Sequence, residues 1–255
     1  MSKSESPLKT VLTASILCIV CSILVSTFAV KLRPLQVKNQ ELDVKKNILS
    51  AAGLLKEGLS APEIEEAYSS NIEELLVDFE TAQKASGDIK SFDMNAASKI
   101  ATMSVEIPKS VDKAGLGRRS KKAKIYLIKN GQEIDGVILP ISSKGLWSTM
   151  LGFLALERDL KTVKGFAYYS HGETPGLGGE VDNPKWKKQW VGKQVYDNSQ
   201  TPKVRLAKNG ASGEYEVDAL SGATITSQGI ENSFTYWLGD HAYKKILNNI
   251  AAGRL

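Results

Sequence analysis

The stretch KIYLIKNGQEIDGVILP, residues 124–140, decides the class of fold. It contains two apolar runs, and the dipeptide Asn130-Gly131 stands between them. Asn-Gly is the strongest short-range signal for a tight β-hairpin turn, because both residues tolerate a positive φ. The stretch therefore predicts two antiparallel strands, at Lys124–Lys129 and Ile134–Pro140.

Two further apolar runs follow this hairpin, at Thr149–Leu156 and Thr162–Tyr169, and a polar Glu-Arg-Asp turn at 157–159 separates them. Four such runs with short polar connections are typical of an antiparallel meander. Beyond them we expect three more elements, a helix over Pro184–Trp190, a short strand over Val204–Leu206 and a helical tail over Gln228–Ile250. Strands grouped together, with helices at both ends of the group, predict an α+β domain.

Upstream of the strands the pattern is helical. After Pro34 we expect one helix over about Gln36–Leu55, and a second that begins at the capping box Ser60-Ala-Pro-Glu63. The second helix carries an apolar stripe at near-helical spacing, which favours core packing. The stripe consists of Ile64, Ala67, Tyr68, Ile72, Leu75, Leu76 and Phe79. The pattern over Ser86–Gly117 is mixed, and no element is assigned to it.

An uncharged apolar run, Val11–Val30, lies near the N-terminus between Lys9 and Lys31. Its roughly 20 residues would span about 30 Å as a helix, which matches the hydrocarbon core of a bilayer. A cleaved signal peptide has a shorter apolar region, about 7–15 residues, and ends in a small-residue cleavage site. The run therefore favours a retained transmembrane helix. Lysine and arginine are balanced close to the run and are more numerous farther beyond its C-terminal end, so charge does not decide the orientation.

Composition excludes several classes of protein. The chain of 255 residues is 42% hydrophobic and has a net charge of +5, which supports one sizeable core and is too mild to indicate nucleic-acid binding. The two cysteines, Cys18 and Cys21, lie inside the apolar run with no histidine nearby. That context favours lipid-facing residues over a metal or redox pair. We expect no metal site and no catalytic acid or base.

Three glycine-rich segments carry the candidate chemistry: Ser143–Ser148, His171–Gly179 and Asp218–Thr224. The third runs into Thr226 and Ser227, either of which can cap the helix expected next. A helix N-terminus offers free amides and a partial positive charge, so it is a ready anion site. The segment therefore predicts a phosphate cradle, and an ordinary helix cap after a glycine turn is the alternative. No GxGxxG fingerprint is present, so we do not expect direct NADH binding.

The motif D-x-x-S-G-A-T at Asp218–Thr224 resembles the sequence on which flavin transferases attach FMN. The segments H-x-E-T-P-G-L-G at 171–178 and G-L-W-S at 145–148 also resemble the FMN-binding domain family. These three motifs, their order and the N-terminal apolar run make the whole chain similar to the family of C subunits of bacterial Na⁺-translocating NADH:quinone reductases. The resemblance implies a short tail over 1–10, a transmembrane helix over 11–31, a helical and mixed segment packing on the core over 34–122, and an FMN-binding domain over 123–255.

The resemblance also implies a site. Thr224 would carry one FMN, whose phosphate forms an ester with the threonine hydroxyl. The other implied FMN contacts are Asp218, Ser221, Gly222, Ala223, Thr226, Leu146, Trp147, Ser148, Glu173, Thr174, Gly176, Leu177 and Gly178. For Asp218, recognition by the flavin transferase and an ordinary Asx turn are both open. For Trp147, covering the flavin ring and plain core packing are both open. We expect a loop hydrogen bond at His171.

The implied function is electron transfer within a sodium pump of the bacterial inner membrane. Electrons would pass from NADH toward ubiquinone through this FMN, while NADH oxidation, quinone reduction and sodium transfer lie mainly on other membrane subunits. The same resemblance places the soluble domain in the periplasm. Two alternatives remain, the G subunit of the related ion-translocating ferredoxin:NAD⁺ oxidoreductase and a membrane-tethered binding domain without a redox group. The long helical segment before residue 123 favours the sodium pump.

Overall fold

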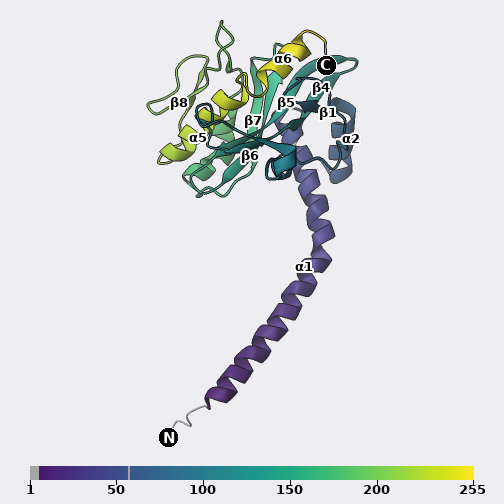
Figure 1. The fold of residues 1–255 in the computed structure, drawn as a ribbon, viewed down its shortest axis with the longest axis vertical. Coiled ribbons are helices and arrows are strands. Elements are labelled where there is room, and N and C mark those ends of the chain that lie inside the picture. The colour runs from purple at the N-terminus through teal and green to yellow at the C-terminus, as the bar shows by residue number, and fades with distance from the viewer. Residues whose placement is uncertain (1–5, 57) are drawn as a thin grey trace. The chain divides into compact units, whose positions relative to one another are not determined.

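The computed structural model describes residues 6–56 and 58–255. The described residues fall into two compact units, divided between Asp43 and Val44. Residues 1–5 of the expected tail lie outside this description. Helix α1 (Pro7–Ala51) makes up the first unit and contributes its last residues to the second (Figure 1). Among the residues described, it is the one helix long and apolar enough to cross a membrane.

The expected helix break at Pro34 was wrong, because α1 continues through this proline. A proline inside a helix removes a single backbone hydrogen bond, and helical sequence continues on both sides of it. The helix ends instead at Ala51. Gly53 follows with a φ of 71°, and the N–H of Leu54 donates to the carbonyl of Leu49 at 2.8 Å. This glycine-based C-terminal motif gives the helix its stop signal.

Helix α2 (Ala61–Asn71) begins as predicted, and the N–H of Ser60 donates to the Glu63 carboxylate at 2.8 Å. The helical stripe expected to continue to Phe79 was wrong, because Ile72–Asp78 forms strand β1. This strand pairs along its whole length with β4 (Lys122–Asn130). The long-range pairing outweighs a local spacing that resembles a helix.

The central sheet has the order β1-β4-β5-β6-β7, and all neighbouring strands are antiparallel. The three further strands are β5 (Glu133–Lys144), β6 (Thr149–Glu157) and β7 (Val163–Ser170). The predicted meander and the α+β class are confirmed. The hairpin closes with Asn130 opposite Glu133, and Gly131 takes a φ of 64° in the turn. The boundary expected between residues 122 and 123 falls inside β4, directly after its first residue, and β4 pairs with β1 from the preceding segment.

Alternating side chains bury both faces of the sheet. One face joins the main core with α5 (Thr224–Trp237) and α6 (Lys244–Ala251), the yellow-green and yellow helices in Figure 1. The end of α1 packs closely on the sheet, since a Cβ atom at Gly165 would lie 2.4 Å from the carbonyl oxygen of Ala51. The sheet strands bury a second set of apolar side chains outside the main core, Leu76, Tyr126, Ile128, Ile138, Phe153, Ala155 and Ala167.

Shorter elements complete the second unit. They are α3 (Met94–Ser98), η1 (Ala101–Met103), η2 (Gly178–Asp182), α4 (Pro184–Lys188), the antiparallel pair β2 (Ser104–Glu106) with β3 (Arg118–Ser120), and the parallel pair β8 (Arg205–Ala207) with β9 (Glu216–Asp218). The expected short helix at 184 and short strand at 204 are both present. The expected single helical tail is two helices, because the chain leaves helical structure between Trp237 and Lys244.

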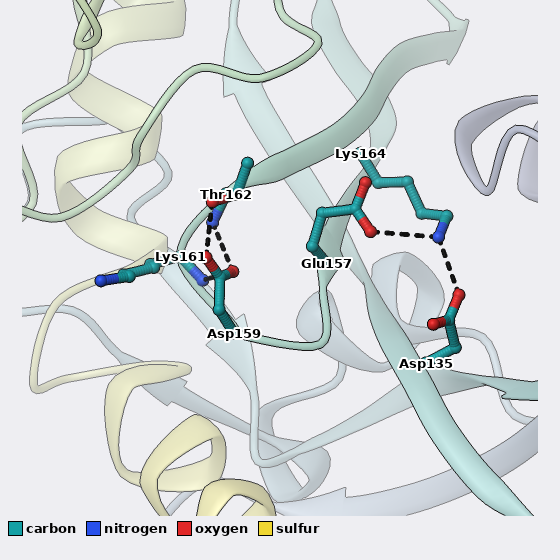
Figure 2. A network of polar contacts seen from close by, with 6 residues as sticks. All are labelled: Asp135, Glu157, Asp159, Lys161, Thr162 and Lys164. Atoms are coloured by element: carbon teal, nitrogen blue, oxygen red, sulfur yellow. Dashed lines mark hydrogen bonds and ion pairs between the residues drawn. The ribbon is translucent and has the colours of Figure 1, made fainter.

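Polar contacts fix the hairpin between β6 and β7, as Figure 2 shows. The Asp159 carboxylate accepts hydrogen bonds from the N–H of Thr162 at 2.8 Å and from its hydroxyl at 2.6 Å. Burial alone would raise the pKa of Asp159, but these bonds hold it below its ordinary value. Lys164 bridges neighbouring strands by pairing with Asp135 at 2.9 Å and Glu157 at 3.1 Å. These polar contacts therefore support the register of β5, β6 and β7.

Candidate functional site

The topology brings the three glycine-rich segments to one end of the sheet. Residues 145–148 connect β5 to β6, and residues 171–179 leave the end of β7. In an antiparallel meander these two connections emerge at the same end. The third segment leads into α5, which packs against β5. The three predicted motifs are thus neighbours in space.

The Glu173 carboxylate joins the three segments. It accepts hydrogen bonds from the N–H groups of Leu146 at 3.1 Å, Trp147 at 3.0 Å and Ser148 at 3.3 Å. The hydroxyl of Thr226, in the first turn of α5, donates to the same carboxylate at 2.6 Å. Glu173 is only 6% exposed. One buried carboxylate therefore receives four donors from two other segments of the site.

Glycines leave the space that this carboxylate needs. A Cβ atom at Gly145 would lie 2.3 Å from Oε1 of Glu173. A Cβ atom at Gly178 would lie 2.7 Å from Oε2 and 2.9 Å from the Thr226 hydroxyl. All three distances are shorter than van der Waals contact. Any side chain at Gly145 or Gly178 would displace the carboxylate from its donors.

The protonation of Glu173 follows from these contacts. Burial on its own raises the pKa of the Glu173 carboxyl, but the hydrogen bonds from Thr226 and from the turn amides outweigh burial and lower the pKa. The folded state therefore favours the ionised carboxylate more than the unfolded state does. The stabilisation is present above the ordinary pKa of about 4.5 and is lost as pH falls through the lower folded-state pKa.

This sign gives a prediction for acid unfolding. We expect the difference in free energy of unfolding between the native chain and Glu173→Gln to be largest near neutral pH and to shrink below about pH 4.5. Urea unfolding of the full chain in mild detergent, measured at several pH values, checks it. Other carboxylates titrate in both proteins and cancel in the difference. A difference that grew at acidic pH would contradict the assigned ionisation of Glu173.

Helix α5 begins at Thr224 with free donors. Its N-cap residue, Ala223, has no polar side-chain atom that could cap the helix. The structure gives no hydrogen-bond partner among the described residues to the N–H groups of Thr224, Ile225 and Thr226. The Thr224 side chain is exposed. An exposed hydroxyl thus stands where three amides and the positive end of a 14-residue helix converge.

The predicted caps at Thr226 and Ser227 were wrong. Thr226 is 1% exposed, and its hydroxyl is turned inward to Glu173. The Ser227 hydroxyl accepts a hydrogen bond from the N–H of Leu220 at 3.0 Å. Both hydroxyls find tertiary partners inside the domain, so the first-turn amides stay open to an external anion.

Exposed apolar side chains surround the start of α5. Trp147 is 71% exposed, which excludes plain core packing for this residue. The site segments contribute three further exposed apolar side chains, Leu146, Leu177 and Ile225. Gly222 takes a φ of 70°, and a Cβ atom there would lie 2.8 Å from Cδ2 of Leu177, which places Leu177 against the glycine turn. This group of four is the apolar surface of the site.

The remaining predicted residues take different positions. Ser221, Thr174 and Gly176 are exposed in the same segments. The Ser148 hydroxyl accepts from the N–H of Gly172 at 2.7 Å, which ties two segments together. The loop hydrogen bond expected for His171 is confirmed, since its Nε2 lies 2.8 Å from the Asp182 carboxylate.

Asp218 does not form an Asx turn. Its carboxylate accepts from the N–H of Ala211 at 2.6 Å, and its carbonyl accepts from Trp186 Nε1 at 2.8 Å. Its own N–H donates to the Gln189 side chain at 3.0 Å. In the folded chain Asp218 therefore anchors the segment before Thr224 to the loop at 208–213.

Sequence reasoning missed how α5 is held on β5. The pairing of β5 with β4 ends at Ile138, so later carbonyls of β5 lack a strand partner on that side. The Tyr243 hydroxyl donates to the carbonyl of Pro140 at 2.7 Å, and Trp237 Nε1 donates to that of Ser142 at 2.8 Å. Pro140 was the one signal of this in the sequence. A proline inside a strand has no N–H to donate, so it indicates that pairing with a neighbouring strand ends there.

Comparisons with known proteins agree with this geometry. Residues 145–239 match a family model described as FMN-binding domain, and this range contains every predicted site residue. The crystal structure of Shewanella oneidensis NqrC is similar, with a TM-score of 0.79 at 30% identity over 85% of this chain and 99% of that one. The fold and site therefore define a domain of the FMN-binding class.

Full-length relatives narrow the class further. The chain is 42% identical to the C subunit of the Na(+)-translocating NADH-quinone reductase of Yersinia pestis, over 97% of this chain and 94% of the relative. It is 43% identical to the corresponding C subunit of Vibrio anguillarum, over 100% and 99%. The chain belongs to this family, the C subunits of Na(+)-translocating NADH-quinone reductases. This family membership favours the sodium pump over the ferredoxin:NAD⁺ oxidoreductase alternative.

Proposed function

We propose that this chain is a membrane-anchored electron-transfer subunit of a Na⁺-translocating NADH:quinone reductase, and that it carries one FMN as a phosphoester on Thr224. The observation that carries the proposal is the exposed Thr224 hydroxyl at the start of α5, beside three N–H groups for which the described residues provide no partner. A phosphodiester keeps one negative charge, and a helix N-terminus stabilises it.

The neighbouring hydroxyls explain the choice of residue. Thr226 and Ser227 are buried and hydrogen-bonded, so a transferase cannot reach them in the folded chain. Ser221 is exposed, but it lies three residues before the start of α5 and is therefore not part of the helix turn that carries the free amides. Thr224 alone combines exposure with the helix start. The ester forms as the Thr224 oxygen bonds to the flavin-side phosphorus of a flavin dinucleotide donor. The pyrophosphate bond breaks, the nucleoside monophosphate from the other half of the donor leaves, and the hydroxyl proton passes to a base of the transferase.

The apolar surface fits the ring of the same cofactor. Trp147, Leu146, Leu177 and Ile225 offer apolar area beside the phosphate position, and such side chains exclude water from a flavin. Bound FMN would supply reversible one- and two-electron chemistry. The residues of this chain would bind its phosphate, flank its ring and limit its access to solvent.

The proposal includes a location and partners. Helix α1 would cross the bacterial inner membrane once through residues 11–31, with the soluble unit on the periplasmic side. The relatives are named as one subunit of a reductase, so other membrane subunits would be the electron donors and acceptors. NADH would bind elsewhere in the complex.

The test is to express the full chain with and without a flavin transferase. We expect one fluorescent band on a denaturing gel with the transferase and none without it. Digestion with trypsin and fragmentation of the peptide that contains Thr224 should place the added mass on that side chain. A colourless chain, or an unmodified peptide from cells with active transferase, would instead support a non-redox binding domain.

A further inference from the structure

The backbone of the 146–148 turn faces inward, while the side chains of Leu146 and Trp147 are exposed. Three consecutive N–H groups point at the Glu173 carboxylate and form a small anion-binding nest that the chain fills with its own acid. The turn also closes on itself, because the N–H of Gly145 donates to the carbonyl of Ser148 at 2.8 Å. The exposed side chain of Trp147 is therefore held through its backbone.

We propose that Glu173 is the positioning residue of the flavin site, and that it holds Trp147 and Leu146 in place relative to the start of α5 before any flavin arrives. The inference rests on the proposed function and assigns Glu173 an indirect role. Its two oxygens are shared among four donors, and Gly145 and Gly178 press against it. The carboxylate thus acts through the turn and through Thr226.

The chemistry of the four donors requires a carboxylate. An ionised carboxylate only accepts hydrogen bonds and has room for about four, whereas an amide must also donate. In Glu173→Gln the NH₂ group can face the Thr226 hydroxyl, which rotates to accept. It then also faces the N–H of Leu146, which can only donate. The variant therefore leaves one buried donor without a partner and loosens the turn.

Preorganisation predicts which property of the flavin depends on Glu173. The phosphoester bond is made at Thr224, which Glu173 does not contact among the hydrogen bonds described. The flavin ring is held in one position only if the side chains that flank it, Trp147 and Leu146, keep their geometry without the ligand. Loss of the carboxylate should therefore spare attachment and disorder the ring.

The experiment compares four full-length chains expressed with a flavin transferase: native, Glu173→Gln, Trp147→Ala and the double variant. Measured quantities are covalent flavin per chain, flavin fluorescence yield and anisotropy, and reduction potential. We expect Glu173→Gln to keep the covalent band, to gain fluorescence and lose anisotropy, and to shift its potential toward that of free FMN. The exposed Glu66→Gln on α2 is the matched control and should behave as native.

The double variant separates an indirect role from a direct one. If Glu173 acts through the turn, its substitution changes little once Trp147 is already alanine, so the effects are not additive. Additive effects, or native anisotropy and potential in Glu173→Gln, would overturn the inference. A native chain without covalent flavin would overturn the proposed function instead. Should Glu173→Gln not fold, Thr226→Val removes one of the four bonds, and native anisotropy in that variant would count against the inference.

Discussion

Thr224→Val is expected to fold normally and to carry no covalent flavin at all. Valine keeps the shape of threonine and lacks the hydroxyl oxygen that the ester needs. The native side chain is exposed and makes no hydrogen bond within the described residues, so the free energy of unfolding should change by no more than about 0.5 kcal/mol. In-gel fluorescence and the visible absorbance of the purified chain measure the loss, and thermal unfolding checks the fold.

Two matched variants test whether the loss of covalent flavin is specific to the hydroxyl at position 224. Thr224→Ser keeps a hydroxyl at the same position and should restore some covalent flavin. Thr226→Val removes a hydroxyl two residues away that is buried against Glu173, and the fluorescent band should remain. If Thr226→Val erased the band and Thr224→Val kept it, the flavin would be attached to Thr226. The free amides at the start of α5 would then not be explained by the FMN phosphate.

The strands of the meander could be predicted because their signals are local. Alternating apolar residues and an Asn-Gly turn act over a few residues, so Lys124–Lys129 and the three runs after it were placed within a few residues of the observed strands. Strand β1 could not be placed in this way. Its partner β4 lies about 50 residues later in the chain, and only that pairing reveals Ile72–Asp78 as a strand.

The sequence motifs predicted which segments form the site, but they did not predict which side chains bond to one another within it. Glycine-rich segments and a helix start indicated an anion site near Thr224, and family resemblance supplied the flavin. Glu173 was expected as an FMN contact, and the structure shows in addition that its carboxylate accepts hydrogen bonds from the amides of the 146–148 turn and from Thr226. Which donors meet a carboxylate depends on three segments converging, and spacing along the chain does not encode that.

Helix α5 is also fixed by contacts that only the folded chain shows. Between the turn and α5, the Ser143 hydroxyl lies 2.6 Å from both the Tyr168 and the Ser233 hydroxyls, and all three are buried. Gly229 sits one turn earlier on the helix, where its backbone meets the carbonyl of Lys144. Lys144 directly precedes the 145–148 turn, so the distance between α5 and β5 sets the position of Thr224 relative to Trp147.

Gly229→Ala is therefore expected to destabilise the domain strongly. A Cβ atom at this position would lie 1.8 Å from the carbonyl oxygen of Lys144, and backbone must move to relieve the overlap. Overpacking of this kind costs about 3 kcal/mol or more when no side chain can rotate away. Helix propensity acts in the opposite direction, because alanine is favoured over glycine inside a helix by about 1 kcal/mol. We expect a net loss of at least about 2 kcal/mol in the free energy of unfolding.

Gln228→Ala is the matched control for this loss. Gln228 is the preceding residue on α5, is exposed, and its side chain donates to Asn232 one turn later, so its substitution should change stability by less than about 0.5 kcal/mol. Urea unfolding of both variants measures the difference, and flavin anisotropy reports whether the displaced helix carries Thr224 away from the turn. An increase in stability for Gly229→Ala would show that helix propensity outweighs packing there, and that α5 can move outward from β5 at little cost.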